Sequence, residues 1–305
     1  MADKSTRPIL SLEERRARRA ERREKQRAQN VLRAAKMHAA RVMAHPPQTP
    51  TPPEPRQKIH IGCSGWFYWH WRNIFYPDSM PTSAWFNHYA GRFKTVELNA
   101  PFYSWPTVNT VNTWRKQAGR RRFVYTVKVS ELITHTRRFE DCAELIKDFG
   151  YIADLLGPYM GCFLFQCPPS ERYSPEKLRL ILSQLDPCRR NVVEFRHASW
   201  WKDEVFSAFR ETGTIFCSCS GPRLPDTLVK TADEIYVRFH GTRQWYRHDY
   251  TKEELAIWAS RIRESVPTQV WAYFNNDRDG YAIKNARAFQ RQLVLDDMET
   301  WTPAT

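Results

Sequence analysis

The stretch V-V-E-F-R-H, residues 192–197, decides the fold. Its apolar residues run directly into Glu194, Arg196 and His197, so a dry segment ends in a cluster of charge. Four other segments have the same form: T-V-E-L-N at 95–99, V-Y-T-V-K at 124–128, I-Y-V-R-F-H-G at 235–241 and V-W-A-Y-F-N-N-D at 270–277. Such runs are typical of buried parallel strands, whose carboxyl ends meet at one edge of a sheet. Because buried charge is costly unless it is paired or used, this edge is predicted to be a ligand site.

Three more apolar runs complete a set of eight candidate strands, at 59–63, 95–99, 123–129, 162–166, 192–196, 214–218, 235–240 and 269–275. Amphipathic segments separate most of them, at 82–90, 107–117, 139–156, 174–185, 200–211, 252–265 and 280–294. Alternation of strand and helix implies a parallel sheet, and eight such units favour an α/β fold of the TIM-type (β/α)8 barrel class. Residues 221–233 leave little room for a helix, so that crossover is expected to be abbreviated.

The composition of the 305 residues changes near residue 58. Residues 1–58 contain 15 Lys and Arg against 6 Asp and Glu, whereas the remaining 247 contain 32 against 27. We therefore expect a basic extension at 1–45, helical or partly disordered, and a proline-rich linker at 46–57. One barrel domain should follow at 58–297, because a TIM barrel needs about 250 residues, and a tail at 298–305.

The extension reads as a helix from Ser11 to about Ala44, because it avoids Gly and Pro and Ser11 with Glu14 fits a capping box. A modest apolar stripe is expected at Val31, Leu32, Ala35, Ala39, Val42 and Met43. The linker P-P-Q-T-P-T-P-P-E-P (46–55) favours an extended spacer, so the extension is expected to be tethered rather than integrated. Its arginines suit an electrostatic arm for nucleic acid or another polyanion, but interspersed Glu residues equally fit a solvated helix.

Cysteine usage and hydropathy indicate a compartment. The seven cysteines form no Cys-x-x-Cys pair, and no N-terminal apolar stretch resembles a signal peptide. No run approaches the roughly 18 apolar residues that would span a bilayer. A cytoplasmic protein without membrane contacts is expected, and the sequence does not indicate its oligomeric state.

The charged strand ends supply the candidate site residues. Period-two alternation places Glu97 with Asn99, and Glu194 with Arg196, on faces expected to point into the barrel mouth. We predict acid–base roles for Glu97, Glu194 and His240, since carboxylates and imidazole transfer protons near neutral pH. The predicted substrate-binding residues are Ser64, Trp66, Asn99, Tyr103, Lys128, His135, Gln166, Arg196, His197, Arg238, Tyr273 and Asn275.

Cations outnumber carboxylates in this set, which favours an anionic ligand such as a phosphate. The competing interpretation is an internal ion-pair network in which Glu97 and Glu194 neutralise Lys128, Arg196 and Arg238. No cofactor is predicted. A divalent metal held by Glu97, Glu194, His240 and Asp277 is a weaker alternative, because the nearby cations would repel it. Aromatic residues after the first two strands are expected mainly to plug the mouth, with Trp66 and Tyr103 as ligand candidates.

Eight ordered motifs carry a family resemblance: I-G-C-S-G-W-F-Y-W-H-W (61–71), F-Y-P (75–77), T-V-E-L-N-A-P-F-Y (95–103), V-K-V-S-E-L-I-T-H (127–135), L-F-Q-C-P-P (164–169), V-E-F-R-H-A-S-W (193–200), Y-V-R-F-H-G (236–241) and Y-F-N-N-D (273–277). From about Lys58 to Val294 the chain resembles the YecE-like family, a domain of unknown function. The resemblance implies a TIM-type barrel and no particular reaction. The basic extension and linker lie outside it.

The function hypothesis is an enzyme, a hydrolase or other phosphoester-acting catalyst, that binds an anionic small molecule or nucleic acid at the strand ends. The alternative is a non-catalytic nucleic-acid-binding protein that uses both the mouth and the basic extension. A glycosidase is disfavoured, because Glu97 and Glu194 come from the second and fifth strands and the sequence does not show their separation.

Overall fold

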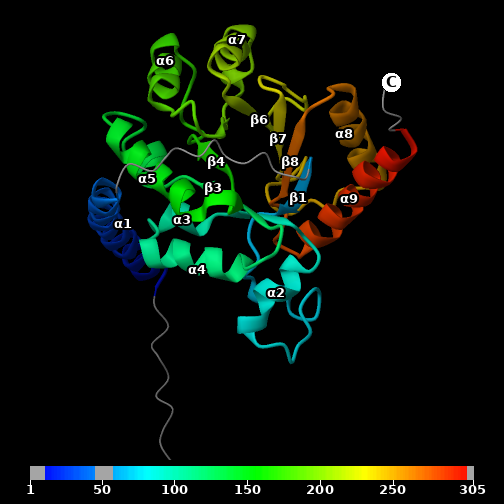
Figure 1. The fold of residues 1–305 in the computed structure, drawn as a ribbon, viewed down its shortest axis with the longest axis horizontal. Helices are drawn as coiled ribbons and strands as arrows, with labels where there is room; N and C mark the ends of the chain where they lie inside the picture. Colours follow the sequence, from blue (N-terminus) through cyan, green and yellow to red (C-terminus); the bar gives the residue numbers. More distant parts are fainter. Residues whose placement is uncertain (1–10, 45–57, 301–305) are drawn as a thin grey trace, which may run out of the picture.

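The computed structural model describes residues 11–44 and 58–300, with side chains placed as far as Leu293. Its centre is a parallel eight-stranded sheet rolled into a nearly closed barrel and surrounded by helices (Figure 1). The strands are β1 Ile59–Cys63, β2 Thr95–Leu98, β3 Val124–Lys128, β4 Met160–Gln166, β5 Asn191–Glu194, β6 Ile215–Ser220, β7 Glu234–Phe239 and β8 Gln269–Phe274. The predicted TIM-type barrel is confirmed.

The helices fall close to the predicted amphipathic segments. They are α1 Leu12–Met43, α2 Trp85–Ala90, α3 Ala100–Tyr103, α4 Val108–Ala118, α5 Ala143–Leu156, α6 Pro175–Gln184, α7 Asp203–Thr212, α8 Lys252–Glu264 and α9 Tyr281–Thr300. The structure describes every residue of the crossover from β6 to β7, and this crossover contains no helix, as predicted. Helix α9 continues three residues past the predicted end of the barrel domain at 297, and the predicted linker at 46–57 lies outside the described residues.

The barrel closes at a seam between β1 and β2, the two ends of the hydrogen-bonded strand order. The Tyr89 hydroxyl bridges this seam, because it accepts from Cys63 N (2.9 Å) and donates to Thr95 O (3.0 Å). Gly62 lies against the same carbonyl: a Cβ at this position would be 2.4 Å from Thr95 O. The absence of a side chain at Gly62 therefore allows the two strands to approach.

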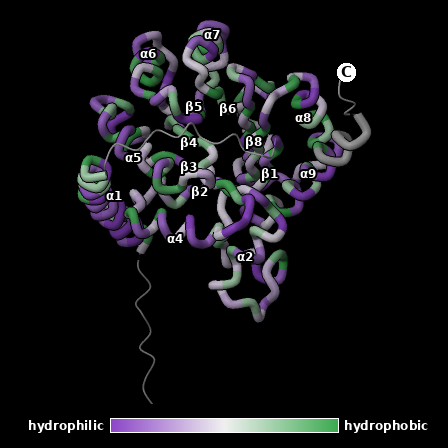
Figure 2. Tube along the Cα trace, viewed as in Figure 1, coloured by the Kyte–Doolittle hydropathy of each residue, from purple (hydrophilic) through white to green (hydrophobic). Residues whose placement is uncertain are grey.

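Apolar side chains fill both sides of the sheet. The larger cluster lies between the strands and the helices, and Figure 2 shows the hydrophobic segments of the strands surrounded by more hydrophilic helix faces. Inside the barrel lies a smaller group: Cys162, Leu164, Val192, Ile215, Cys217, Cys219, Tyr236, Trp271 and Tyr273. Trp271 stacks on His60 with ring centroids 4.0 Å apart. This packed interior supports the polar groups at the strand ends.

Helix α1 is docked on the barrel, contrary to the expectation of a tethered extension. Ser11 and Glu14 form the predicted capping box at its start. Its buried residues are Asn30, Ala34 and Met37, whereas the predicted apolar stripe is wrong: Val31, Leu32, Val42 and Met43 are exposed. A polar residue, Asn30, anchors the helix, so a search for apolar spacing selects the opposite face.

Two observations bear on the predicted compartment. All seven cysteines lie within the described residues, and all are free. Over residues 11–44 and 58–300, no helix combines the length and the apolar character needed to cross a membrane.

Candidate functional site

A buried ion network lies at the carboxyl ends of the strands. Arg238 on β7 donates from Nη1 to Glu194 Oε2 and from Nη2 to Glu97 Oε1, both at 2.5 Å. Glu97 also accepts from Ser64 Oγ (2.7 Å) and from the Tyr236 hydroxyl (2.6 Å). Arg238, Glu97 and Glu194 are completely buried. The interpretation of an internal ion-pair network is therefore correct for these three side chains.

A second guanidinium, that of Arg196, completes the network toward the solvent. Arg196 Nε donates to Glu194 Oε1, and its Nη2 lies 3.1 Å from His240 Nε2. His240 Nε2 is also 3.3 Å from Glu194 Oε1, and its Nδ1 is 3.3 Å from the Asn275 side-chain amide. Strands β2, β5 and β7, with the residues that follow β1 and β8, thus contribute one connected polar cluster.

The charges of the two arginines fix the protonation states of their neighbours. Burial alone would raise the pKa of Glu194, but the guanidiniums of Arg196 and Arg238 hold it well below its usual range. Burial, together with the same two charges, keeps the pKa of His240 well below its usual value. At neutral pH the site therefore holds an ionised Glu194 and a neutral imidazole.

Within the described chain, Lys128 at the end of β3 lacks the carboxylate partner that Arg196 and Arg238 have. Its ammonium lies over the Phe102 ring, 3.9 Å from the ring centroid, and only 8% of the residue is exposed. No carboxylate among the described residues lies within 4.0 Å of Nζ. Burial and the charge of Arg238 lower the pKa of Lys128 to about 7. This buried amine, unlike the two guanidiniums, has no fixed counter-charge.

A turn of π-helix, Leu132–Thr136, follows β3 and carries His135. The His135 ring meets the same Phe102 ring in a T-shaped arrangement, with centroids 4.9 Å apart. Burial and the charge of Lys128 lower the pKa of His135 to about 4. Such π-helical turns often accompany functional sites. This turn carries His135, a neutral base like His240, to the Phe102 ring that Lys128 also contacts.

An open cavity of about 670 Å³ lies beside the network, over the ends of β4 to β7. The predicted residues Gln166, Arg196 and His197 line it, and Trp245 and Tyr246 form another wall. The Arg196 guanidinium lies 4.4 Å from the Trp245 ring centroid. The volume is within the range of small-ligand sites.

Trp245 and Tyr246 were missed by the sequence reasoning. Their signal is G-T-R-Q-W-Y-R, residues 241–247, which directly follows the charged end of a strand. Tyr246 has a φ of +68°, and its backbone N donates to His240 O (2.7 Å). A non-glycine residue held in this conformation is a feature that often accompanies functional sites.

The other predicted residues divide into those at the mouth and those away from it. Asn99 Nδ2 donates to Ser64 O (3.2 Å), and its buried Oδ1 has no hydrogen-bond partner in the described part of the chain. Tyr103 is 55% exposed at the rim. Tyr273 instead lies within the barrel, bonded to two threonine hydroxyls, and Trp66 packs against Phe86. The structure therefore places Tyr273 and Trp66 away from the mouth. Of the predicted residues in the described part of the chain, Gln166, Arg196 and His197 are the ones that line the cavity itself.

The predicted metal ligands do not converge. Asp277 contacts His70 and Trp71 instead, and burial raises its pKa to about 6. In the described residues, one group of possible ligands does meet, Glu194 with Cys217 and Cys219, whose ligand atoms lie within 4.8 Å of one another. Arg196 and Arg238 already occupy this carboxylate, and burial raises the pKa of Cys217 well above its usual value. These residues do not suit a divalent ion.

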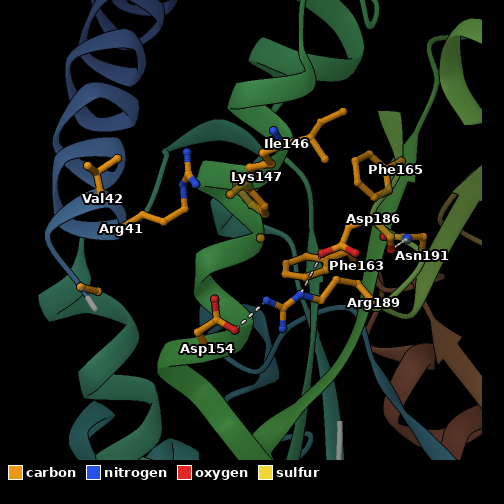
Figure 3. A pocket seen from close by; sticks show the side chains of 13 residues that line it. Arg41, Val42, Ile146, Lys147, Asp154, Phe163, Phe165, Asp186, Arg189 and Asn191 are labelled. Carbon is orange, nitrogen blue, oxygen red and sulfur yellow. Dashed lines mark hydrogen bonds and ion pairs between the residues drawn. The ribbon is translucent and has the colours of Figure 1, made fainter. Parts of the chain in front are cut away.

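A second cavity, of about 380 Å³, lies between α1, α5 and the outer faces of β4 and β5 (Figure 3). Arg189 on its wall is paired with Asp154 (2.6 Å) and Asp186 (3.5 Å). Asn191, the first residue of β5, places this cavity at the opposite end of the strand from Glu194. Because its charges are paired, we assign it to helix packing.

These features define a (β/α)8-barrel protein with a polar, cation-bearing mouth at the carboxyl ends of its strands. Residues 60–305 match the family described as "Protein of unknown function DUF72", and the chain belongs to that family. The resemblance to the YecE-like family is thereby confirmed.

Members of the DUF72 and UPF0759 groups match most of this chain, and their names give no activity. The chain is 27% identical to the UPF0759 protein YunF of Bacillus subtilis over 281 residues, covering 79% of this chain and 95% of the relative. A crystal structure of a DUF72 family protein from Thermotoga maritima superposes with a TM-score of 0.70 at 26% identity, covering 78% of this chain and all of the other. A DUF72 protein from Enterococcus faecalis gives 0.67 at 19% identity, covering 77% and 95%.

Proposed function

We propose that the protein binds a phosphate-bearing anion at the barrel mouth and catalyses hydrolysis or transfer at its phosphoester. The observation that carries this proposal is the unpaired amine of Lys128. Glu97 and Glu194 balance the guanidiniums of Arg196 and Arg238, so a protonated Lys128 leaves one uncompensated positive charge. An anion would supply the missing counter-charge.

The cavity provides room for the rest of the ligand. Arg196 faces the cavity with a guanidinium already oriented by Glu194, which reduces the cost of ordering it on binding. Trp245 offers an aromatic wall beside it. A phosphate between Lys128 and Arg196 would therefore have its organic substituent against an aromatic surface.

The protonation states of the site residues suit acid–base chemistry. Lys128, with a pKa of about 7, is suited to give a proton to a leaving oxygen when the P–O bond breaks. Of the predicted catalytic residues, His240 would accept the proton of the attacking water, and Glu194 Oε1, 3.3 Å from His240 Nε2, would stabilise the imidazolium that forms. The arrival of the anion would raise the basicity of both. Glu97, engaged by three donors, would hold Arg238 in position.

Turnover of a chromogenic aryl phosphodiester and of dinucleotides tests the proposal. Lys128→Met, Glu194→Gln and His240→Ala should each lower the rate at least tenfold, with folding checked by circular dichroism and thermal unfolding. Exposed Lys116→Met on α4 serves as the control. Unchanged turnover in all three variants would overturn the catalytic assignment.

The alternative is a barrel that holds nucleic acid without cleaving it. It is favoured by one observation: the arginine-rich helix α1 is bonded through Asn30 and Arg27 to the segments that follow β2 and β3. This alternative expects binding with steep salt dependence and no product. Folded Glu194→Gln protein should still bind, because phosphate contacts need only the cations.

A further inference from the structure

One face of α1 carries barrel-contacting residues in its second half and arginines in its first half. In its second half this face packs on the barrel through Asn30, Ala34 and Met37. The same spacing of three and four residues, continued toward the N-terminus, selects Arg23, Arg19 and Arg16. A face that would bury apolar side chains if the barrel continued beneath it instead presents three arginines.

The acidic residues of α1 lie on the other side. At 3.6 residues per turn, Glu13, Glu14, Glu21 and Glu24 fall away from the packed face. The ion pair of Lys25 with Glu21 (2.7 Å) is on that outer side. Within the described residues, Arg16, Arg19 and Arg23 form no ion pair with a carboxylate. A helix that was merely solvated would not need this segregation of charge.

Specific contacts fix the segment of α1 that adjoins this arginine face, and they place it beside the mouth. Asn30 Nδ2 donates to Tyr103 O (3.0 Å), and Asn30 Oδ1 accepts from Trp105 N (3.0 Å), which ties α1 to the loop after β2. Arg27 lies 3.7 Å from Glu131, just after β3. Arg16 is 14 residues before Asn30, so the arginines extend about 21 Å from this anchor along the helix.

The charges of both α1 and the mouth act on the Tyr103 hydroxyl. Burial raises the pKa of Tyr103, and the charges of Arg23 on α1 and Arg238 in the mouth both oppose that rise. The exposed Tyr103 ring therefore lies within electrostatic reach of both groups of cations.

We infer that the arginine face of α1 and the barrel mouth form one binding path for a single-stranded nucleic acid. This inference rests on the proposed function and names its substrate class. The mouth binds one phosphate and its nucleotide, Tyr103 and Trp245 offer rings for stacking bases, and α1 binds the neighbouring phosphates. A cavity of about 670 Å³ admits a nucleotide and not a duplex.

The same features disfavour a membrane surface. The arginine face lacks the aromatic and large apolar residues that would enter a lipid interface, apart from Leu12 at its end. The mouth next to it is concave and lies at the end of the strands. A flexible strand can follow both surfaces, whereas a flat bilayer cannot.

Fluorescence anisotropy with labelled dT2 and dT12 on the full chain tests the inference. The variant R16Q/R19Q/R23Q removes three charges from the arginine face, and R18Q/K25Q/K36Q removes three from the outer face as a matched control. We expect the first variant to bind dT12 at least tenfold more weakly, with a salt slope lower by about 2 from three lost contacts. Its affinity for dT2, and both affinities of the control variant, should change less than threefold.

The outcomes separate this inference from the proposed function. Equal loss of dT12 affinity in both triple variants, or no loss in either, overturns the path along α1, while dT2 binding that depends on Lys128 preserves the mouth site. Absence of dT2 binding together with α1-dependent dT12 binding overturns the joint path and the anion site in the mouth. Binding of vesicles with 30% phosphatidylglycerol but not of dT12 would assign the arginines to a membrane instead.

Discussion

At Lys128, the stability of the empty protein conflicts with the anion binding that we propose. A buried amine without a counter-charge costs free energy, because its pKa is lowered from its ordinary value near 10.4 to about 7. The neighbouring Arg196 and Arg238 avoid this cost through Glu97 and Glu194. A binding role would explain why such a residue is retained.

Lys128→Met should therefore raise the stability of the empty protein. We expect the free energy of unfolding to increase by on the order of 1–3 kcal/mol at pH 6, because an isosteric apolar chain removes the desolvation cost. Urea denaturation measures this change, and exposed Lys116→Met should stay within about 0.5 kcal/mol of the parent. A destabilised Lys128→Met variant would show that the amine has a favourable partner in the folded protein.

Anion binding should depend on pH through the same amine. A bound phosphodiester stabilises the charged form and raises the pKa of Lys128, so binding takes up a proton. Affinity should be constant below about pH 7 and fall about tenfold per unit above it, until the pKa of the bound state is reached. Titrations with dT2, whose diester does not titrate in this range, measure the effect.

Lys128→Arg provides the control, because a guanidinium stays charged throughout. This variant should bind dT2 with affinity that no longer falls between pH 7 and 9. A slope that persists in Lys128→Arg would assign the titration to another group.

The sequence predicted the positions of some site residues but not all of their pairings. Period-two alternation correctly placed Glu97, Glu194 and Arg238 together inside the mouth. It could not decide which cations the two carboxylates neutralise, since that depends on side-chain reach across β2, β5 and β7. The acid–base and binding assignments remain predictions.

At the scale of elements, the strands were predictable and the details of barrel closure were not. Continuous apolar runs locate all eight strands to within about two residues, because burial on both faces leaves a strong local signal. Closure depends instead on Gly62 and Tyr89, which are adjacent only after folding. The aromatic loop at Trp245 and Tyr246 was missed for the same reason, since its contact with Arg196 is non-local.

Gly62→Ala should weaken the seam between β1 and β2. The new methyl group would lie 2.4 Å from Thr95 O, so the strands must separate or the Tyr89 bridge must break. We expect a loss of about 2–4 kcal/mol in the free energy of unfolding, measured by urea denaturation.

Gly150→Ala in α5 is the matched control, because an added Cβ there meets no atom within 4 Å. This helix-interior change should stabilise the protein by roughly 0.5–1 kcal/mol. Similar effects of the two substitutions would contradict the assigned role of the seam.

Helix α1 lies outside the part of the chain shared with the family, yet it packs on that part. The family match begins at residue 60, while α1 ends at Met43. In Figure 1, α1 lies outside α4 and α5 at the edge of the ring of helices. Its contacts with α5 include Arg41 Nε donating to the buried carboxylate of Asp148 (2.8 Å). The sequence indicated the helix but not its docking, because the anchors Asn30 and Arg41 are polar.

Removal of residues 1–57 should leave a folded barrel of reduced stability. The barrel loses burial of Met37 and Ala34 and the pairing of Asp148, worth about 2–4 kcal/mol together, which corresponds to a fall of about 5–10 °C in Tm. Tyr103 O and Trp105 N regain water when Asn30 is removed, so they add little to the loss. Calorimetry measures the Tm of the shortened chain. The Tm of full-length Asn30→Ala should lie between that of the shortened chain and that of the parent protein. An unchanged Tm would mean that α1 does not stay docked in solution, and the arginine face would then have no fixed position beside the mouth.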